Sequence, residues 1–323
     1  MANASKSKLI KIISVAGLIL LAAALFVFAS RSNKKTKSFV KDGFFFDTYV
    51  SFTVYSAEDS KYLEECLGMC RKYQALFDKN TPGSDIYRIN NAGTKPVKVD
   101  IETYNLLSDA LEICNETEGK IDITVENLIL LWGFENEIPP TTLPNKDDMA
   151  KALELTDYKA IVLSDGCTVT KLNKDIKIDP GFIAKGYIAD KIGEFLKSKG
   201  VESALINLGG NILVIGSKPN GDDFTIGIKD PVNPDQTSGS VNVSNKSVVT
   251  SGTYERYVTI EGIKYHHILD PQTGYPAESE IQSVTIISDS SEYGDALSTA
   301  CLILGEKESQ ILLDKYNAKA IFK

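Results

Sequence analysis

Helical and strand-type segments do not alternate regularly along this chain, and that order limits the folds open to it. Two amphipathic helices are expected first, at about 57–77 and 100–117, and a third at 180–200. A run of strand-type segments separated by turn residues then occupies 204–289, before a last helix at 293–305. Because a doubly wound parallel sheet needs alternating strands and helices, the pattern predicts an α+β fold.

Four local expectations accompany this pattern. The β-branched and aromatic segment 44–56 is expected to form one strand. Segments 168–173 and 176–179 are expected to pair as a hairpin, and 118–134, which carries the only tryptophan, is expected to be a loop. Gly305 is placed to cap the last helix.

The N-terminus indicates membrane targeting. Residues 12–29 form an uncharged apolar run of roughly the length that crosses a bilayer as a helix. We therefore expect a membrane anchor or signal segment at 1–30, a basic linker at 31–40 and one folded domain at 41–323. Basic residues flank the run on both sides, so they do not choose its orientation. An uncleaved anchor with the body outside the cytoplasm is favoured, although small residues near Ala29 leave cleavage open.

The remainder of the chain is acidic. Seven of the 35 basic residues lie in residues 1–37, which hold no acid, so the rest carries 28 basic against 43 acidic residues, a net charge of −15. Such a body does not bind nucleic acid by neutralising phosphates. A phosphorylated ligand would need a divalent cation or backbone N–H groups to offset the like charge.

The five cysteines form an odd set, which argues against a full disulfide framework. Cys66 and Cys70 are four residues apart on an expected helix, a spacing typical of one helical face. We expect the cysteines to be small buried hydrophobic residues.

The sequence "IDPGFIAKGYIAD" holds a first candidate site. Asp179 before Pro180 is typical of a helix N-cap followed by proline at the first helical position. The same helix start, with Lys185 one turn in, could instead bind an anion such as a phosphate. Asp179 could also accept a hydrogen bond from a ring N–H of a ligand.

Two glycines interrupt the strand pattern of "INLGGNILVIG". Gly209 and Gly210 indicate either a β-bulge or a close approach of the backbone to a ligand. The sequence leaves both alternatives open.

Asp295 and Thr299 are four residues apart on an otherwise apolar helix, so their oxygen atoms share one face. A carboxylate and a hydroxyl suit a hard cation such as Mg²⁺, with backbone carbonyls, water and phosphates completing its shell. The alternative is a capping aspartate with a threonine bonded back to the helix.

Both histidines of the chain stand together in "KYHHILDPQTGYP". The segment "DPQTG" has the composition of a tight turn. His266 and His267 precede it on an expected strand, so they point to opposite faces and cannot act on one atom. One of them can still serve as a base near neutral pH.

Seven segments in order resemble the bacterial FAD:protein FMN transferases, the ApbE family. They are "SDIYRINN" (84–91), "GKIDITVENLILLWGF" (119–134), "IDPGFIAKGYIAD" (178–190), "INLGGNI" (206–212), "SGTYERY" (251–257), "HHILDPQTGYP" (266–276) and "GDALSTACLILG" (294–305). The resemblance covers nearly all of the chain after the linker.

This resemblance implies a two-lobed α+β domain that binds FAD between its lobes with Mg²⁺ at the pyrophosphate. The implied reaction moves FMN from FAD to a threonine hydroxyl of a target protein and releases AMP. By resemblance, His267 matches the base, and Asp295, Thr299 and the carbonyl of Phe182 match the metal ligands. Four further positions match the lining of the FAD site: Asp122, Asp179, Lys185 and Ile268.

The chain departs from the family in three places. Phe182 stands where many members have glycine or alanine, and Asn80 stands where an aromatic residue often contacts the flavin. Many members are lipoproteins, whereas no cysteine lies near the apolar run here.

Two other functions remain open at this point. A metal-dependent FAD pyrophosphatase would use the same Asp295 and Thr299 with water as the nucleophile, and a membrane-anchored flavin-binding protein would use no base. By resemblance, the partners are FAD and a flavin-accepting protein, such as a membrane redox-pump subunit or an extracytoplasmic FMN-bearing domain.

Overall fold

The computed structural model describes residues 37–233 and 235–323. The expected anchor at 1–30 and most of the expected linker therefore lie outside the described residues. Within the described part of the chain, no helix has the length and apolar character that crossing a membrane requires. The first strand begins at Phe39, so the last residues of the expected linker belong to the folded body.

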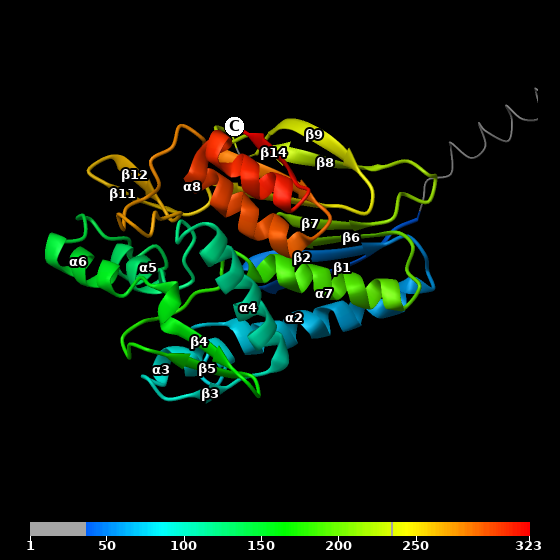
Figure 1. The fold of residues 1–323 in the computed structure, drawn as a ribbon. Helices are drawn as coiled ribbons and strands as arrows, with labels where there is room; N and C mark the ends of the chain where they lie inside the picture. Colours follow the sequence, from blue (N-terminus) through cyan, green and yellow to red (C-terminus); the bar gives the residue numbers. More distant parts are fainter. Residues whose placement is uncertain (1–36, 234) are drawn as a thin grey trace, which may run out of the picture.

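A seven-stranded antiparallel sheet forms the centre of the molecule (Figure 1). Its strand order places the first and last strands of the chain at opposite edges. In that order the strands are β1 (Phe39–Phe45), β2 (Thr48–Val54), β6 (Ala204–Leu208), β7 (Asn211–Ile215), β10 (Ser247–Gly252), β13 (Ser283–Ser288) and β14 (Lys319–Phe322).

Three helices pack against this sheet and against one another. They are α2 (Leu63–Phe77), α7 (Ala184–Ser198) and α8 (Ser291–Lys315). The hairpin of β8 (Phe224–Lys229) and β9 (Thr237–Val243) packs on the other face. Leu213 joins the helix-side core while its neighbour Val214 joins the hairpin-side core, as the alternation of side chains along a strand requires.

Helices α7 and α8 touch through their backbones at Gly186. A Cβ atom on this residue would lie 2.2 Å from the carbonyl oxygen of Ser291 and 2.6 Å from the Cα of Glu292. Only glycine permits this approach. The contact brings the start of α7 beside the start of α8.

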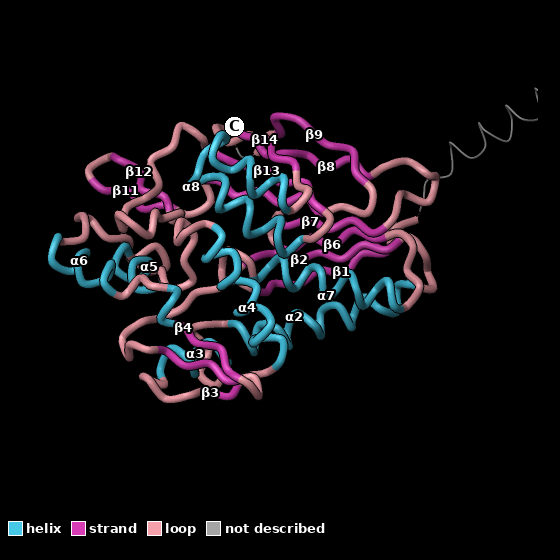
Figure 2. The backbone as a smooth tube through the Cα atoms, viewed as in Figure 1, coloured by secondary structure: helices cyan, strands magenta, loops and turns pink. Residues whose placement is uncertain are grey.

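The second lobe lies to the left and below in Figure 2, where short helices and strands are joined by long loops. A small apolar core with Trp132, Leu128 and Leu269 holds part of it together. Its elements are α3 (Asp85–Asn91), the sheet of β3 (Val97–Lys98), β5 (Thr168–Lys171) and β4 (Ile161–Ser164), α4 (Ile101–Glu116), α5 (Glu126–Trp132), α6 (Lys146–Glu154) and the hairpin of β11 (Tyr257–Ile260) and β12 (Ile263–His266). Of the two 3₁₀ turns, Asp59–Tyr62 leads directly into α2 of the first lobe, and Tyr158–Ala160 precedes β4.

The mixture of an antiparallel sheet, packed helices and smaller sheets confirms the α+β prediction. The helices expected at 57–77 and 100–117 are present as α2 and α4. Asp100 caps α4 by accepting a hydrogen bond from Glu102 N. Four cysteines are buried, as expected, Cys167 is half-buried, and all five are free thiols in this structure.

Three local predictions were wrong. Segment 44–56 is a hairpin, because Phe46 and Asp47 both have a φ of 55° and reverse the chain between β1 and β2. Segment 168–171 pairs with 161–164, not with 176–179. The expected loop at 118–134 contains helix α5, ended by Gly133 in the left-handed conformation.

Two glycine predictions are resolved by the backbone. Gly209 and Gly210, with φ of 64° and 94°, form the turn between β6 and β7, so they are not a bulge. Gly305 ends a helical segment as expected, with φ 80° and ψ 170°, but a further helical segment follows it directly within α8.

Candidate active site

A cavity of about 660 Å³ lies between the central sheet and the second lobe. This volume is typical of small-molecule and cofactor sites. Seven of the eight residues predicted from the sequence line it: Asp179, Phe182, Lys185, His267, Ile268, Asp295 and Thr299. Gly209 also lines it, so the close-approach alternative for the glycine pair agrees with its position.

Asp122 does not line the cavity. Its Oδ1 accepts hydrogen bonds from the N–H and the hydroxyl of Thr124, and its Oδ2 accepts one from Tyr158 N. This buried carboxylate therefore ties two loops together behind the cavity lining, and its assignment to the FAD site stays a prediction.

The segment before α7 differs from the predicted helix start. Asp179 Oδ1 accepts from Gly181 N at 2.8 Å, and the next residues form turns, so α7 begins only at Ala184 with Ile183 as its N-cap. Asp179 is therefore not the helix cap. Lys185 lies in the first turn of α7 and lines the cavity.

The late start of α7 frees a backbone carbonyl. The N–H of Gly186 would bond Phe182 in a continuous helix, but it donates to Asp295 Oδ2 at 2.9 Å. The carbonyl oxygen of Phe182 accepts no hydrogen bond from any described residue. Phe182 and Asp295 thus present unused oxygen lone pairs at one wall of the cavity.

A chain of hydroxyl groups fixes the direction of the Thr299 hydroxyl. Ser298 Oγ donates to the Asp295 carbonyl at 2.8 Å, which uses its only proton. Ser251 Oγ, 2.7 Å from Ser298 Oγ, must then donate to it. Thr299 Oγ1, 3.3 Å from Ser251 Oγ, must in turn donate to Ser251. The three contacts can be made together only in this arrangement, which keeps lone pairs of Thr299 free for a ligand.

These oxygens fit a hard divalent cation. The donor set is one carboxylate, one hydroxyl and one carbonyl, all oxygen ligands of the kind that Mg²⁺ prefers. The described residues contain no cluster of three or more His, Cys, Asp or Glu side chains that could hold a metal. A cation here would therefore complete its shell with water and substrate phosphates. Burial raises the pKa of Asp295, and the charge of Lys185 opposes that rise.

Asn211 adds a donor that the sequence reasoning missed. Its Oδ1 accepts a hydrogen bond from Ser291 Oγ, which turns its amide nitrogen the other way. The side chain is buried and lines the cavity, and its Nδ2 completes no hydrogen bond of normal geometry with the described residues, although the Asn211 amide acts on Asp295 and lowers the pKa of that carboxyl against the rise from burial. The signal in the sequence is that an asparagine directly follows the two glycines of the turn.

The two histidines are separated by the fold. His266 ends β12 and does not line the cavity, whereas His267 does. Nδ1 of His267 lies 3.1 Å from the carbonyl oxygen of Arg256, which can only accept, so Nδ1 carries the proton and Nε2 keeps its lone pair. Burial lowers the pKa of His267 to about 4, so the ring is a neutral base at pH 7.

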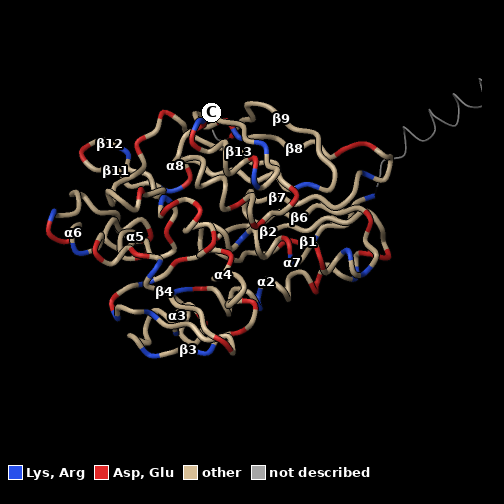
Figure 3. Tube along the Cα trace, in the orientation of Figure 1, with Lys and Arg blue, Asp and Glu red and all other residues tan. Residues whose placement is uncertain are grey.

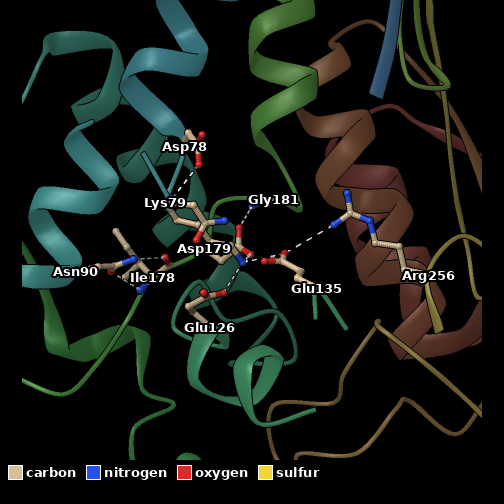
Figure 4. A network of polar contacts seen from close by, with 10 residues as sticks. Asp78, Lys79, Asn90, Glu126, Glu135, Ile178, Asp179, Gly181 and Arg256 are labelled. Carbon is tan, nitrogen blue, oxygen red and sulfur yellow. Dashed lines mark hydrogen bonds and ion pairs between the residues drawn. The ribbon is translucent and has the colours of Figure 1, made fainter. Parts of the chain in front are cut away.

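A network of charged groups lies at another wall of the cavity (Figure 4). Lys79 Nζ contacts Glu126 Oε2 at 2.6 Å, Asp179 Oδ2 at 2.8 Å and Glu135 Oε1 at 3.0 Å. Glu135 also lies 3.8 Å from Arg256. Only Asp179 of this network was predicted. Lys79 stands outside the seven matching segments, and Glu126 lies in one of them, 119–134, from which only Asp122 was assigned to the site.

Lys and Arg positions alternate with Asp and Glu positions along the described chain, as Figure 3 shows.

Comparison with known proteins identifies relatives of this chain. The family model described as "ApbE family" matches residues 46–322. A protein named FAD:protein FMN transferase from Treponema pallidum is 35% identical over 81% of this chain and 76% of its own length. A protein of the same name from Klebsiella pneumoniae is also 35% identical, over 82% of this chain and 83% of its own length.

Solved structures agree. The ApbE protein of Thermotoga maritima superposes with a TM-score of 0.81 at 33% identity, covering 88% of this chain and 94% of that one. The flavin transferase ApbE from Vibrio cholerae gives 0.78 at 25% identity, covering 88% and 93%.

The α+β fold superposes on that of a solved ApbE protein, and the chain belongs to the ApbE family. The expectation that it is an enzyme is confirmed by relatives that carry the transferase name over most of its length.

Proposed function

We propose that this enzyme transfers FMN from FAD to a threonine hydroxyl of a target protein in a Mg²⁺-dependent reaction that releases AMP. The observation that carries the proposal is the meeting of His267, Asp295, Thr299 and the free Phe182 carbonyl at one cavity. A base and a set of oxygen ligands for a cation are the two requirements of alcohol attack on a pyrophosphate.

The residues divide the work as follows. Nε2 of His267 takes the proton of the threonine hydroxyl as its oxygen attacks the phosphorus of the FMN half. The new bond joins the threonine oxygen to that phosphorus, and the bond to the bridging oxygen breaks, so AMP leaves with the electron pair. Lys185 and the Asn211 amide bind phosphate oxygens. Asp295, Thr299 and the Phe182 carbonyl would hold Mg²⁺, which supplies charge neutralisation at the pyrophosphate.

The proposal places the flavin ring against Asp179 and Ile268, with Asn80 in place of an aromatic contact. We also propose that residues 1–30 anchor the enzyme to the membrane with its domain outside the cytoplasm. Its targets would then be redox-pump subunits or extracytoplasmic FMN-bearing domains. Both follow from the apolar run at 12–29 and from the resemblance.

The test mixes the protein with FAD, Mg²⁺ and a target domain that carries the acceptor threonine. A covalent, UV-fluorescent flavin on the target, with one equivalent of AMP released, is the expected result. FMN and AMP free in solution with an unmodified target would favour the pyrophosphatase. FAD binding without any product would favour a flavin-binding protein.

A further inference from the structure

Lys79 is a buried ammonium group among three carboxylates. Its side chain is 10% exposed, and three carboxylates contact it within 3.0 Å. Two of its three N–H groups donate hydrogen bonds, to Glu126 Oε2 and Asp179 Oδ2, and Glu135 is an ion-pair partner at 3.0 Å. The charge of Lys79 is thus matched by carboxylates of the protein, although the side chain lines the cavity. Its influence on a ligand passes through its partners.

Asp179 is the partner that stays ionised. Burial alone would raise the pKa of Asp179, but the Lys79 ammonium and the N–H of Gly181 outweigh burial and lower it. For Glu126, burial together with the charge of Asp179 raises the pKa to about 7. The Lys79 ammonium thus favours ionisation of Asp179, at the cavity wall, over ionisation of Glu126, which does not line the cavity.

The contacts also fix how Asp179 is turned. Oδ2 is held by Lys79, and Oδ1 by Gly181 N, both at 2.8 Å. Each carboxylate oxygen has two lone pairs, so one on each oxygen stays available. Asp179 therefore presents an acceptor-only edge to the cavity, in an orientation set from two sides.

We propose that Lys79 is a positioning residue for recognition of the flavin ring, acting by holding Asp179 as the acceptor for the imide N–H of the isoalloxazine. This deepens the proposed function and rests on the flavin lying at Asp179. A carboxylate that can only accept disfavours a ring without that N–H, because a buried acceptor of Asp179 would then lack its hydrogen bond.

The experiment compares riboflavin with riboflavin methylated at its imide nitrogen, each titrated against the full protein by fluorescence quenching. Wild-type protein should bind the methylated ring about 10- to 100-fold more weakly, as expected for loss of a hydrogen bond to a charged group. In Lys79→Met the two affinities should converge to within about threefold. AMP binding in the presence of Mg²⁺ should not change.

Two further variants separate position from charge. Lys79→Met with Glu126→Gln keeps the formal charge of the cluster and should still lose the discrimination. Glu126→Gln alone leaves Lys79 on Asp179 and should keep it. Lys120→Met, at a lysine outside the cavity lining, is the matched control. Thermal unfolding shows whether each variant folds. If Lys79→Met alone does not fold, the ratio of the two ring affinities is measured in the double variant, whose formal charge is unchanged.

The outcomes are distinct. Equal binding of the two rings by wild-type protein would overturn the proposal, and so would discrimination that survives in both Lys79 variants. Discrimination that depends on Lys79, in a protein that transfers no FMN, would support this inference and count against the transferase proposal. A protein that binds neither ring would overturn both.

Discussion

The carbonyl oxygen of Arg256 lies 3.1 Å from Nδ1 of His267 and also accepts a hydrogen bond from the His267 N–H at 3.0 Å. One backbone group therefore fixes both the ring and the chain that carries it. The tautomer with Nε2 unprotonated is the one required of a base. No side chain of Arg256 is needed for this contact.

His267→Ala should reduce FMN transfer by about 10²- to 10⁴-fold, the usual contribution of a general base, while FAD affinity changes little. The matched control is His266→Ala, because His266 does not line the cavity and should have a far smaller effect. Single-turnover formation of fluorescent target measures the rate. Equal losses of transfer rate in His267→Ala and His266→Ala would contradict the assignment of the base to His267 alone.

The pH profile of transfer should lack a His267 limb near pH 6.5. Burial lowers the pKa of His267 to about 4, so the base stays unprotonated well below neutral pH. Single-turnover rates should fall only on approach to pH 4. A midpoint near the ordinary histidine value of about 6.5 would refute this.

The same shift affects stability with a defined sign. His267 is neutral in the fold and takes up a proton more readily when unfolded, so its contribution to the free energy of unfolding is complete above pH 6.5 or so. That contribution is lost as pH falls from there toward 4. Urea denaturation measures the free energy of unfolding of wild-type protein and of His267→Ala. The difference between the two should shrink as pH falls from about 6.5 toward 4.

Ser251→Ala should weaken cation binding although Ser251 is not a proposed ligand. Without the Ser251 hydroxyl, the Thr299 O–H has no acceptor that holds its proton away from the cation, so the Thr299 oxygen is a poorer ligand. Loss of such a supporting contact typically costs about 10- to 100-fold in metal affinity. Mn²⁺ titration followed by electron paramagnetic resonance measures it directly.

Thr253→Ala is the control for that measurement, since its exposed hydroxyl bonds only the Gln282 carbonyl and lies two residues away. Ser251→Thr retains a hydroxyl and should recover much of the affinity. Unaltered Mn²⁺ binding in Ser251→Ala would show that the hydroxyl chain does not orient Thr299.

Gly186→Ala should destabilise the fold by about 1–3 kcal/mol, because its Cβ would lie 2.2 Å from the Ser291 carbonyl and force α7 and α8 apart. Gly68→Ala, in α2 with no atom within 4 Å of the added Cβ, should instead stabilise by about 0.5–1 kcal/mol. Urea denaturation of both variants gives the comparison. A stable Gly186→Ala protein would disprove the close contact.

The sequence predicted what depends on periodicity and local chemistry. Helices α2 and α4 follow their apolar stripes, and Asp295 and Thr299 share a face because helical spacing demands it. The reversal at Phe46 and Asp47 was missed because neither residue is a glycine or asparagine. The aromatic segment 44–56 was therefore predicted to be one continuous strand.

Long-range pairing explains the rest. Lys79 meets Glu126 and Asp179, 47 and 100 positions further along, and no spacing rule reaches that far. Asp122 was assigned to the FAD site by motif, whereas its oxygens are used within the fold. A motif identifies the residue, but only the tertiary contacts show whether its lone pairs are available.

The position of α8 has a consequence for biosynthesis. Residues that line the cavity extend from Phe46 to Thr299, and the carboxylate that completes it arrives only with a helix near the end of the chain. A nascent chain that has not yet emerged beyond α8 lacks Asp295 and cannot assemble the catalytic centre. If Asp295 holds the cation as proposed, truncated products would be inactive, and the enzyme would become competent only when synthesis is nearly finished.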